Sequence, residues 1–133
     1  MARAPTSDYL VLDIETIPDD QRWSAPEPSG GEPARPSPFP PLWAHRIVVA
    51  GYAWLEAYRL ARFGVLEGPA AADPDVRERA LLAELSALIG RHRPTLVTFN
   101  GRGFDLPVIA LRALCHGVPL GWYYRDRGVR ARH

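Results

Sequence analysis

Two carboxylates stand close together in residues 9–16, whose sequence is YLVLDIET. The stretch begins with apolar and β-branched residues, a composition typical of a strand buried on both faces. Side chains at positions i and i+2 of a strand point the same way, so Asp13 and Glu15 are expected to project together while Ile14 points into the core. Neighbouring negative charges repel unless a cation lies between them. The spacing therefore favours a metal site over the alternative, a strand end that frays into solvent.

A third acid, Asp105, ends the segment NGRGFD at residues 100–105, which follows a short run of strand-forming residues. Its glycines permit unusual backbone angles. Asp105 has a plainer interpretation too, because the first turn of a helix favours acidic side chains. Adjacent strand ends would, however, bring Asp105 near Asp13 and Glu15, and three carboxylates around one cleft suit Mg²⁺ or Mn²⁺. Two such ions about 3.5–4 Å apart can activate a water and stabilise the leaving oxygen of a phosphodiester.

Phe104 has two interpretations that the sequence leaves open. An aromatic ring beside such a site can stack on a terminal base, as rings do in single-strand binding sites. The same ring can instead be buried to anchor the turn. Two other residues with reactive side chains are interpreted structurally: Cys115 as core packing at helical spacing, and His92 as a surface residue at a helix C-terminus.

The first half of the chain must supply the sheet that positions these acids. Residues 46–54 and 58–66 are predicted strands, joined as a hairpin around residues 55–57. Residues 18–45 hold Gly30-Gly31 and several of the chain's 14 prolines, a composition that forms neither a ladder nor a helix. This insertion is interpreted as flexible. A loop over the active cleft and a polyproline ligand at residues 36–41 are the alternatives.

Two helices are predicted in the second half. The first is capped by Asp73 and starts with Pro74; its apolar stripe is Leu81, Leu82, Leu85, Leu88 and Ile89, and its solvated side is Arg77, Glu78, Arg79 and Glu84. After a strand at residues 95–99, the second runs from about Asp105 to His116, where Gly117 ends it. Its apolar face is predicted to carry Val108, Leu111, Leu114 and Cys115. Residues 118–133 form a basic, aromatic tail without a period. The order strand, strand, strand, helix, strand, helix indicates one α/β layer, with a hairpin flanking the first strand and a helical crossover to the fourth.

Composition sets broad limits. The 133 residues predict one domain, and a net charge of +1 gives no basic field that by itself announces nucleic acid. All 16 basic residues are arginine, which suits bidentate phosphate contacts, and the single cysteine excludes an internal disulfide. No apolar run reaches membrane-spanning length and no signal peptide is evident, so a cytoplasmic protein without a membrane partner is expected.

The two acidic motifs carry a resemblance. Asp13-Ile-Glu15-Thr16 resembles the first motif of the DEDD 3′-5′ exonucleases, and residues 100–105 resemble their second. With LVTF before it and LPVI after it, the second stretch is similar to the predicted exonucleases related to the proofreading domain of family B DNA polymerases. The resemblance implies a ribonuclease H-like fold, two divalent ions, and removal of nucleotides from a 3′ end, with a single-stranded nucleic acid as the expected partner.

By this resemblance Asp13, Glu15 and Asp105 are metal ligands and catalytic residues, while Thr16, Asn100, Arg102 and Phe104 shape the substrate site. The family also has a fourth carboxylate, preceded by Tyr or His on a later helix. After Asp105 the only acid is Asp126, which follows Tyr123 by three residues and does not fit that motif. The domain spanning residues 1–133 is therefore expected to be incomplete, lacking the last strand and helix.

Three hypotheses follow from the sequence. The first is a metal-dependent 3′-5′ exonuclease that is weak or inactive with three ligands. The second is a non-catalytic module that binds single-stranded nucleic acid through its arginines, namely Arg102, Arg125, Arg127, Arg130 and Arg132. The third is an unstable fragment with exposed apolar surface. The sequence does not distinguish DNA from RNA and indicates no protein partner.

Overall fold

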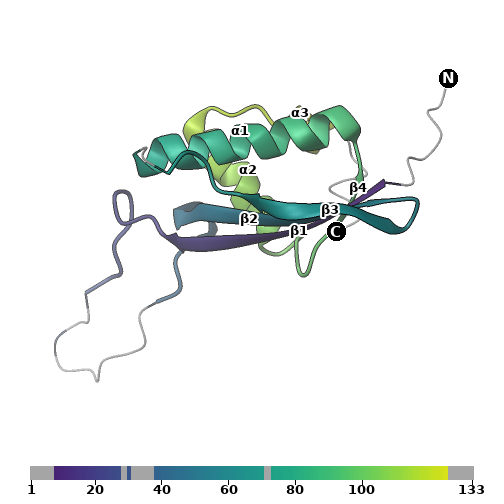
Figure 1. Ribbon diagram of the computed structural model, residues 1–133. Helices are drawn as coiled ribbons and strands as arrows, with labels where there is room; N and C mark the ends of the chain where they lie inside the picture. The colour runs from purple at the N-terminus through teal and green to yellow at the C-terminus, as the bar shows by residue number, and fades with distance from the viewer. Residues whose placement is uncertain (1–7, 28–29, 31–37, 71–72, 126–133) are drawn as a thin grey trace.

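The protein is described by a computed structural model covering residues 8–27, 30, 38–70 and 73–125 (Figure 1). The strands are β1 Asp8–Pro18, β2 His45–Glu56, β3 Arg59–Leu66 and β4 Thr95–Val97. The helices are α1 Pro74–His92, α2 Asp105–His116 and α3 Gly121–Arg125, and a short 3₁₀ turn, η1 Leu42–Ala44, precedes β2.

The four strands form one mixed sheet in the order β3-β2-β1-β4. β1 pairs antiparallel with β2, β2 pairs antiparallel with β3, and β1 pairs parallel with β4. Helix α1 supplies the crossover from β3 to β4 and lies along one face of the sheet (Figure 1). The predicted α/β architecture, with its flanking hairpin and helical crossover, is confirmed, and it is consistent with a ribonuclease H-like fold.

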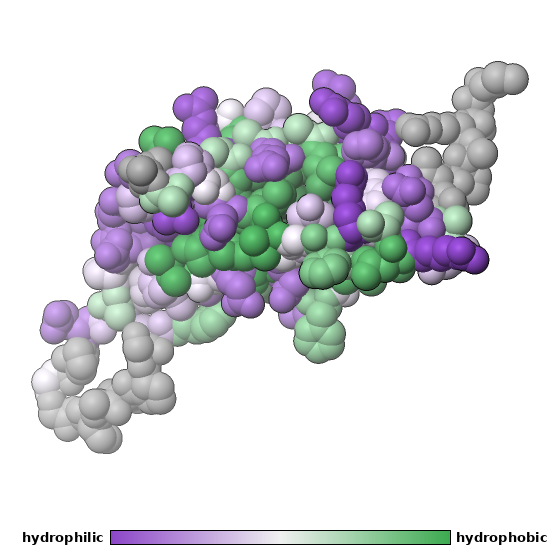
Figure 2. Space-filling model, viewed as in Figure 1, coloured by the Kyte–Doolittle hydropathy of each residue, from purple (hydrophilic) through white to green (hydrophobic). Residues whose placement is uncertain are grey.

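The prediction that the first strand is buried on both faces is wrong. Leu10, Leu12 and Ile14 are buried against the helices, whereas the alternate residues Val11 and Asp13 are exposed. The outer face, which also carries Val65 and Val97, stays exposed in the part of the chain that the structure describes. Figure 2 shows apolar residues interspersed with polar ones on the side of the molecule in view. β1 therefore has the alternating burial of a sheet covered on one face.

Helix α1 begins as predicted, because the Asp73 side chain accepts a hydrogen bond from the Asp75 backbone N–H at 2.8 Å and Pro74 takes the first position. The solvated side predicted for this helix is wrong at Glu78, which is only 1% exposed. Glu78 accepts a hydrogen bond from the Ile47 backbone N–H at 2.8 Å and so links the helix to β2.

The predicted apolar face of α2 is right at Val108 and wrong at the other positions. Leu111, Leu114 and Cys115 are exposed, so Cys115 is not a core residue. The residues that α2 buries are Asp105, Leu106, Val108, Ile109, Ala110, Arg112 and Ala113. The helix is rotated relative to the prediction because Arg112, its one central charged residue, is bound in the interior.

The basic, aromatic tail, whose sequence shows no period, contains the short helix α3 near its start. The Trp122 ring is buried, and its Nε1–H donates to the Ser86 hydroxyl at 3.2 Å. Ser86 in turn donates to the Pro119 carbonyl at 2.7 Å. The remaining tail residues, Asp126 and the tail arginines Arg127, Arg130 and Arg132 among them, lie outside the described residues. Among the helices that are described, none is long and apolar enough to cross a membrane.

Candidate active site

The first pair of acids stands on the outer face of the sheet. Asp13 and Glu15 are exposed, and β1 continues past them to Pro18. The fraying strand end considered from the sequence is therefore wrong. Gly51 lies directly opposite Asp13 on β2, and without a side chain it leaves the face beside Asp13 open. Asp13 and Glu15 thus share one accessible face, as their i, i+2 spacing predicts.

The turn before α2 contains two glycines at which a Cβ would clash with a neighbouring side chain. A Cβ at Gly101 would lie 1.9 Å from the Thr98 hydroxyl oxygen, and one at Gly103 would lie 2.6 Å from Asn100 Oδ1. Asn100 has a left-handed backbone with a φ of 54°, and its carbonyl accepts hydrogen bonds from Gly103 and Phe104, both at 3.0 Å. The Gly101 carbonyl accepts from Leu106 at 2.8 Å. This turn fixes the position of Asp105 at the first residue of α2.

Asp105 is buried, and its Oδ2 has no hydrogen-bond partner. Burial, and to a smaller extent the negative charge of Asp13, raises the pKa of this carboxyl to about 6. The charge of Asp13 therefore acts on Asp105, while the convergence of all three acids on one metal site stays a prediction. Asp105 also stands in the first turn of α2, where the helix dipole favours a negative charge.

A second cluster of potential metal ligands, whose atoms lie closer to one another, is found elsewhere in the structure. Among the residues that the structure describes, one group of three offers ligand atoms within 4.8 Å of one another: Asp75, Glu78 and His116. Asp13, Glu15 and Asp105 are therefore spaced more widely than this group. The closer cluster is already satisfied by cationic side chains, because Asp75 accepts from Arg46 at 2.6 Å and Glu78 accepts from Arg112 at 2.5 Å.

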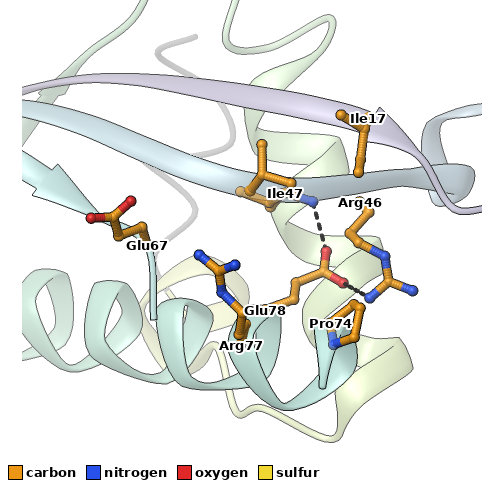
Figure 3. Close-up of a pocket in the computed structure, with 8 residues that line it drawn as sticks. Ile17, Arg46, Ile47, Glu67, Pro74, Arg77 and Glu78 are labelled. Carbon is orange, nitrogen blue, oxygen red and sulfur yellow. Dashed lines mark hydrogen bonds and ion pairs between the residues drawn. The ribbon is translucent and has the colours of Figure 1, made fainter. Parts of the chain in front are cut away.

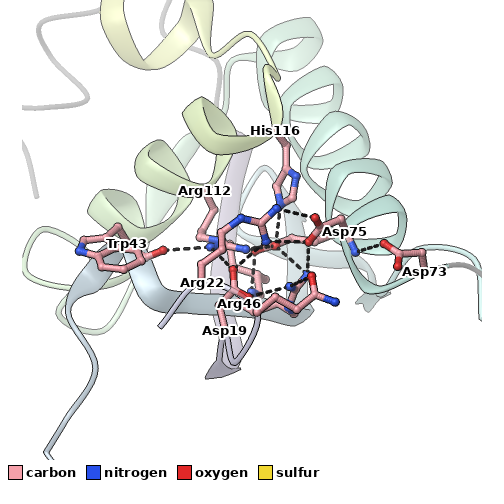
Figure 4. Close-up of polar contacts among 11 residues, drawn as sticks. Asp19, Arg22, Trp43, Arg46, Asp73, Asp75, Arg112 and His116 are labelled. Carbon is pink, nitrogen blue, oxygen red and sulfur yellow. Dashed lines mark hydrogen bonds and ion pairs between the residues drawn. The ribbon is translucent and has the colours of Figure 1, made fainter. Parts of the chain in front are cut away.

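These side chains belong to a buried ion network where the end of β1, the start of β2, α1 and α2 meet (Figure 4). Asp19 accepts from Arg22 at 3.0 Å, Arg46 at 2.9 Å and Arg112 at 2.9 Å. Burial opposes ionisation of Asp19, but its hydrogen bonds to arginine hold its pKa below the usual range. Glu78 binds Arg112 through both oxygens, and His116 Nε2 lies 2.7 Å from its Oε2.

Beside this network is a cavity of about 180 Å³ (Figure 3). Its lining residues are Ile17, Arg46, Ile47, Val48, Glu67, Pro74, Arg77 and Glu78. Figure 3 shows Glu78 bound to both the Ile47 backbone and Arg46, the latter at 3.6 Å. Both carboxylate oxygens of Glu78 therefore have partners, whereas Oδ2 of Asp105 has none. The network holds these elements together and leaves the exposed acids Asp13 and Glu15 and the buried acid Asp105 as the candidate ligands.

His45, which the sequence analysis did not single out, adjoins the predicted substrate residues. This buried imidazole has its Nδ1 at 3.0 Å from the Thr16 hydroxyl and its Nε2 at 3.0 Å from the Pro40 carbonyl. Because a carbonyl only accepts, Nε2 carries the proton and Nδ1 accepts from Thr16. Phe104 is half-buried and meets the imidazole edge-on at 5.0 Å between ring centroids. Asn100 and Arg102 are exposed on the turn.

A comparison with protein families agrees with this geometry. The family model described as predicted 3′-5′ exonuclease related to the exonuclease domain of PolB matches residues 37–132, more than half of the chain. The chain belongs to this family. The matched range includes the family-like turn and Asp105 but begins after Asp13 and Glu15, so the match does not cover those two acids. No curated protein was found to match the chain.

Proposed function

We propose that this exonuclease-related domain removes nucleotides from the 3′ end of a single-stranded nucleic acid in a reaction that depends on Mg²⁺ or Mn²⁺. The observation that carries the proposal is the buried Asp105 oxygen without a partner, next to the charge of Asp13. A carboxylate that is desolvated and set beside a second carboxylate is destabilised as an anion until a cation joins it. The site therefore fits a hard divalent cation.

Asp13, Glu15 and Asp105 would hold the cations. When bound, two such ions supply an activated water and neutralise the charge that develops on the leaving oxygen of a phosphodiester. Asp13 is the acid that both other ligands adjoin, since it shares a strand face with Glu15 and acts electrostatically on Asp105. The open face beside Gly51 gives a phosphodiester access to this acid from the solvent side of the sheet.

Catalytic competence is expected to be low. Of the residues that the structure describes after Asp105, none is acidic, so this part of the chain supplies three of the four carboxylates that the resemblance implies. Fewer ligands hold the ions less firmly, because each carboxylate contributes both charge and coordination. Slow metal-dependent cleavage is the expected behaviour.

The proposal is tested with a single-stranded DNA and an RNA of the same sequence, each labelled at the 5′ end. The wild-type chain is expected to shorten at least one of them into a ladder with Mn²⁺ or Mg²⁺, and not with EDTA. Asp13→Ala should remove the ladder, whereas Asp20→Ala, which changes an exposed acid outside the site, should leave it unchanged.

Two outcomes would contradict the proposal. A ladder that persists in Asp13→Ala would show that these acids are not the catalytic ones. Binding of the strand that persists in EDTA, weakens with salt and yields no ladder with either ion would favour the alternative, a non-catalytic module that binds single-stranded nucleic acid through arginine.

A further inference from the structure

Phe39 is an exposed aromatic residue at the candidate active site. Its side chain is 74% exposed although its ring lies 4.7 Å from the imidazole of His45 and 6.3 Å from the ring of Phe104, centroid to centroid. Phe104 immediately precedes Asp105, and His45 is bound to Thr16, which immediately follows Glu15. Phe39 is therefore joined by direct contacts to the neighbours of two of the three proposed ligands.

The backbone around Phe39 is restrained. Pro38 precedes it, and Pro40 and Pro41 follow it, so the φ angles of the flanking residues are fixed and Phe39 itself is kept from helical backbone angles. The Pro40 carbonyl accepts the hydrogen bond from His45 Nε2 at 3.0 Å, which ties this segment to the start of β2. An exposed ring that is already held in place loses little conformational entropy when a ligand packs on it.

Burial of the ring in the fold does not explain this position. An exposed aromatic side chain is ordinary on its own, but this one touches a buried, fully hydrogen-bonded histidine and the half-buried phenylalanine that precedes Asp105. Its free face is apolar, planar and uncharged. Such a face suits a nucleobase, because every base has a π-face and stacking requires no particular sequence.

We propose that Phe39 is a substrate-positioning residue whose exposed ring stacks on the base at the 3′ end of a bound single strand. The proposal rests on the proposed function and names the part of the substrate that this residue recognises. His45 holds the Phe39 ring beside Phe104, so the terminal base is placed next to Asp105 and its phosphodiester over the exposed acids of β1.

The experiment uses a single strand that carries 2-aminopurine as its 3′-terminal base, a phosphorothioate at the last linkage to slow cleavage, and a label at the 5′ end. In Mg²⁺, wild-type protein should quench the 2-aminopurine fluorescence on binding. Phe39→Ala should reduce both the quenching and the affinity, the latter by roughly 5- to 100-fold. Phe39→Tyr should restore both, because the ring is retained.

The matched control is Phe63→Ala, which removes a ring of similar exposure, 76%, from β3. It should behave as wild type. Circular dichroism spectra and thermal melts of the variants verify folding. Phe39→Ala is expected to melt at the wild-type temperature because the Phe39 side chain is mostly in solvent.

The outcomes separate this proposal from the proposed function. The stacking role of Phe39 is overturned if Phe39→Ala binds the strand and quenches the 2-aminopurine fluorescence as wild type does. It is also overturned if Phe63→Ala loses as much affinity and quenching as Phe39→Ala. The nuclease proposal stands in both cases. The stacking role is likewise overturned if the wild-type protein binds the strand without quenching the 2-aminopurine fluorescence. If the 5′ label shows that the wild-type protein does not bind the strand at all, both proposals fall.

Discussion

Asp105→Asn is expected to abolish metal-dependent cleavage and, at the same time, to raise the free energy of unfolding. The loss of activity should be about 100-fold or more, since changing residues that merely support a metal ligand already costs about 10- to 100-fold. The gain in stability follows from the pKa of about 6, because keeping this buried carboxylate ionised at neutral pH opposes folding. Relieving the whole pKa shift would raise the free energy of unfolding by about 3 kcal/mol. The unpaired asparagine amide is expected to reduce the gain to about 1–2 kcal/mol.

The same substitution should change how stability depends on pH. A carboxyl whose pKa is raised by folding contributes stability below about pH 4, and that contribution is lost as pH rises through about 6. Urea denaturation in EDTA at pH 4.5 and 7.5 measures this loss in the wild type, and Asp105→Asn should lack it. Asp20→Asn is the control, because that acid is exposed. An Asp105→Asn protein that is less stable than wild type at pH 7.5, or that still cleaves, would contradict this assignment.

Arg112→Met is expected to be the most destabilising of the substitutions considered. Arg112 is fully buried and donates to Glu78 at 2.8 and 2.5 Å, to Asp19 at 2.9 Å and to the Trp43 carbonyl at 2.9 Å. Removing the guanidinium leaves two buried carboxylates with fewer partners, which costs about 3–5 kcal/mol. That is a large part of the roughly 5–15 kcal/mol that keeps a domain folded.

Urea denaturation monitored by tryptophan fluorescence measures the effect. Arg79→Met, which changes an exposed arginine of α1, should stay within about 0.5 kcal/mol of wild type. Adding Glu78→Gln to Arg112→Met should recover part of the loss, because it removes one uncompensated charge and keeps an acceptor for the Ile47 backbone. If Arg112→Met and Arg79→Met unfold at the same urea concentration, the network does not hold the elements together as described.

The layout of the fold could be predicted because its signals are local. Hydrophobic periodicity and the Asp73-Pro74 start define α1, and the β-branched segments with a tight connection define the hairpin. A helix between β3 and β4 then requires a crossover, which places β4 beside β1 in the sheet. That topology is the reason to expect Asp105 near Asp13, and the charge of Asp13 contributes to the raised pKa of Asp105.

The buried ion network could not be predicted, because its members are solvated residues by every local criterion. Glu78 is buried only because Arg112 and the Ile47 N–H meet it from other parts of the chain. The missed signal was Arg112, the one charged residue in the middle of an otherwise apolar stretch of α2. Its burial turns α2 so that Leu111 and Leu114 face solvent. His45 was missed for a similar reason, since its partners Thr16 and Pro40 are not recognisable from sequence spacing.

The central claim is that Asp105 joins Asp13 and Glu15 in holding a divalent cation, and an NMR titration tests it without relying on activity. The protein is labelled with ¹³C at its aspartate side-chain carboxyls, the Asp105 signal is assigned by its loss in Asp105→Asn, and its shift is followed from pH 3.5 to 8. In EDTA the midpoint should lie near pH 6. Saturating Mg²⁺ should lower this midpoint, because a bound cation competes with the proton for the carboxylate. An Asp105 midpoint that is the same with Mg²⁺ as with EDTA would contradict the account.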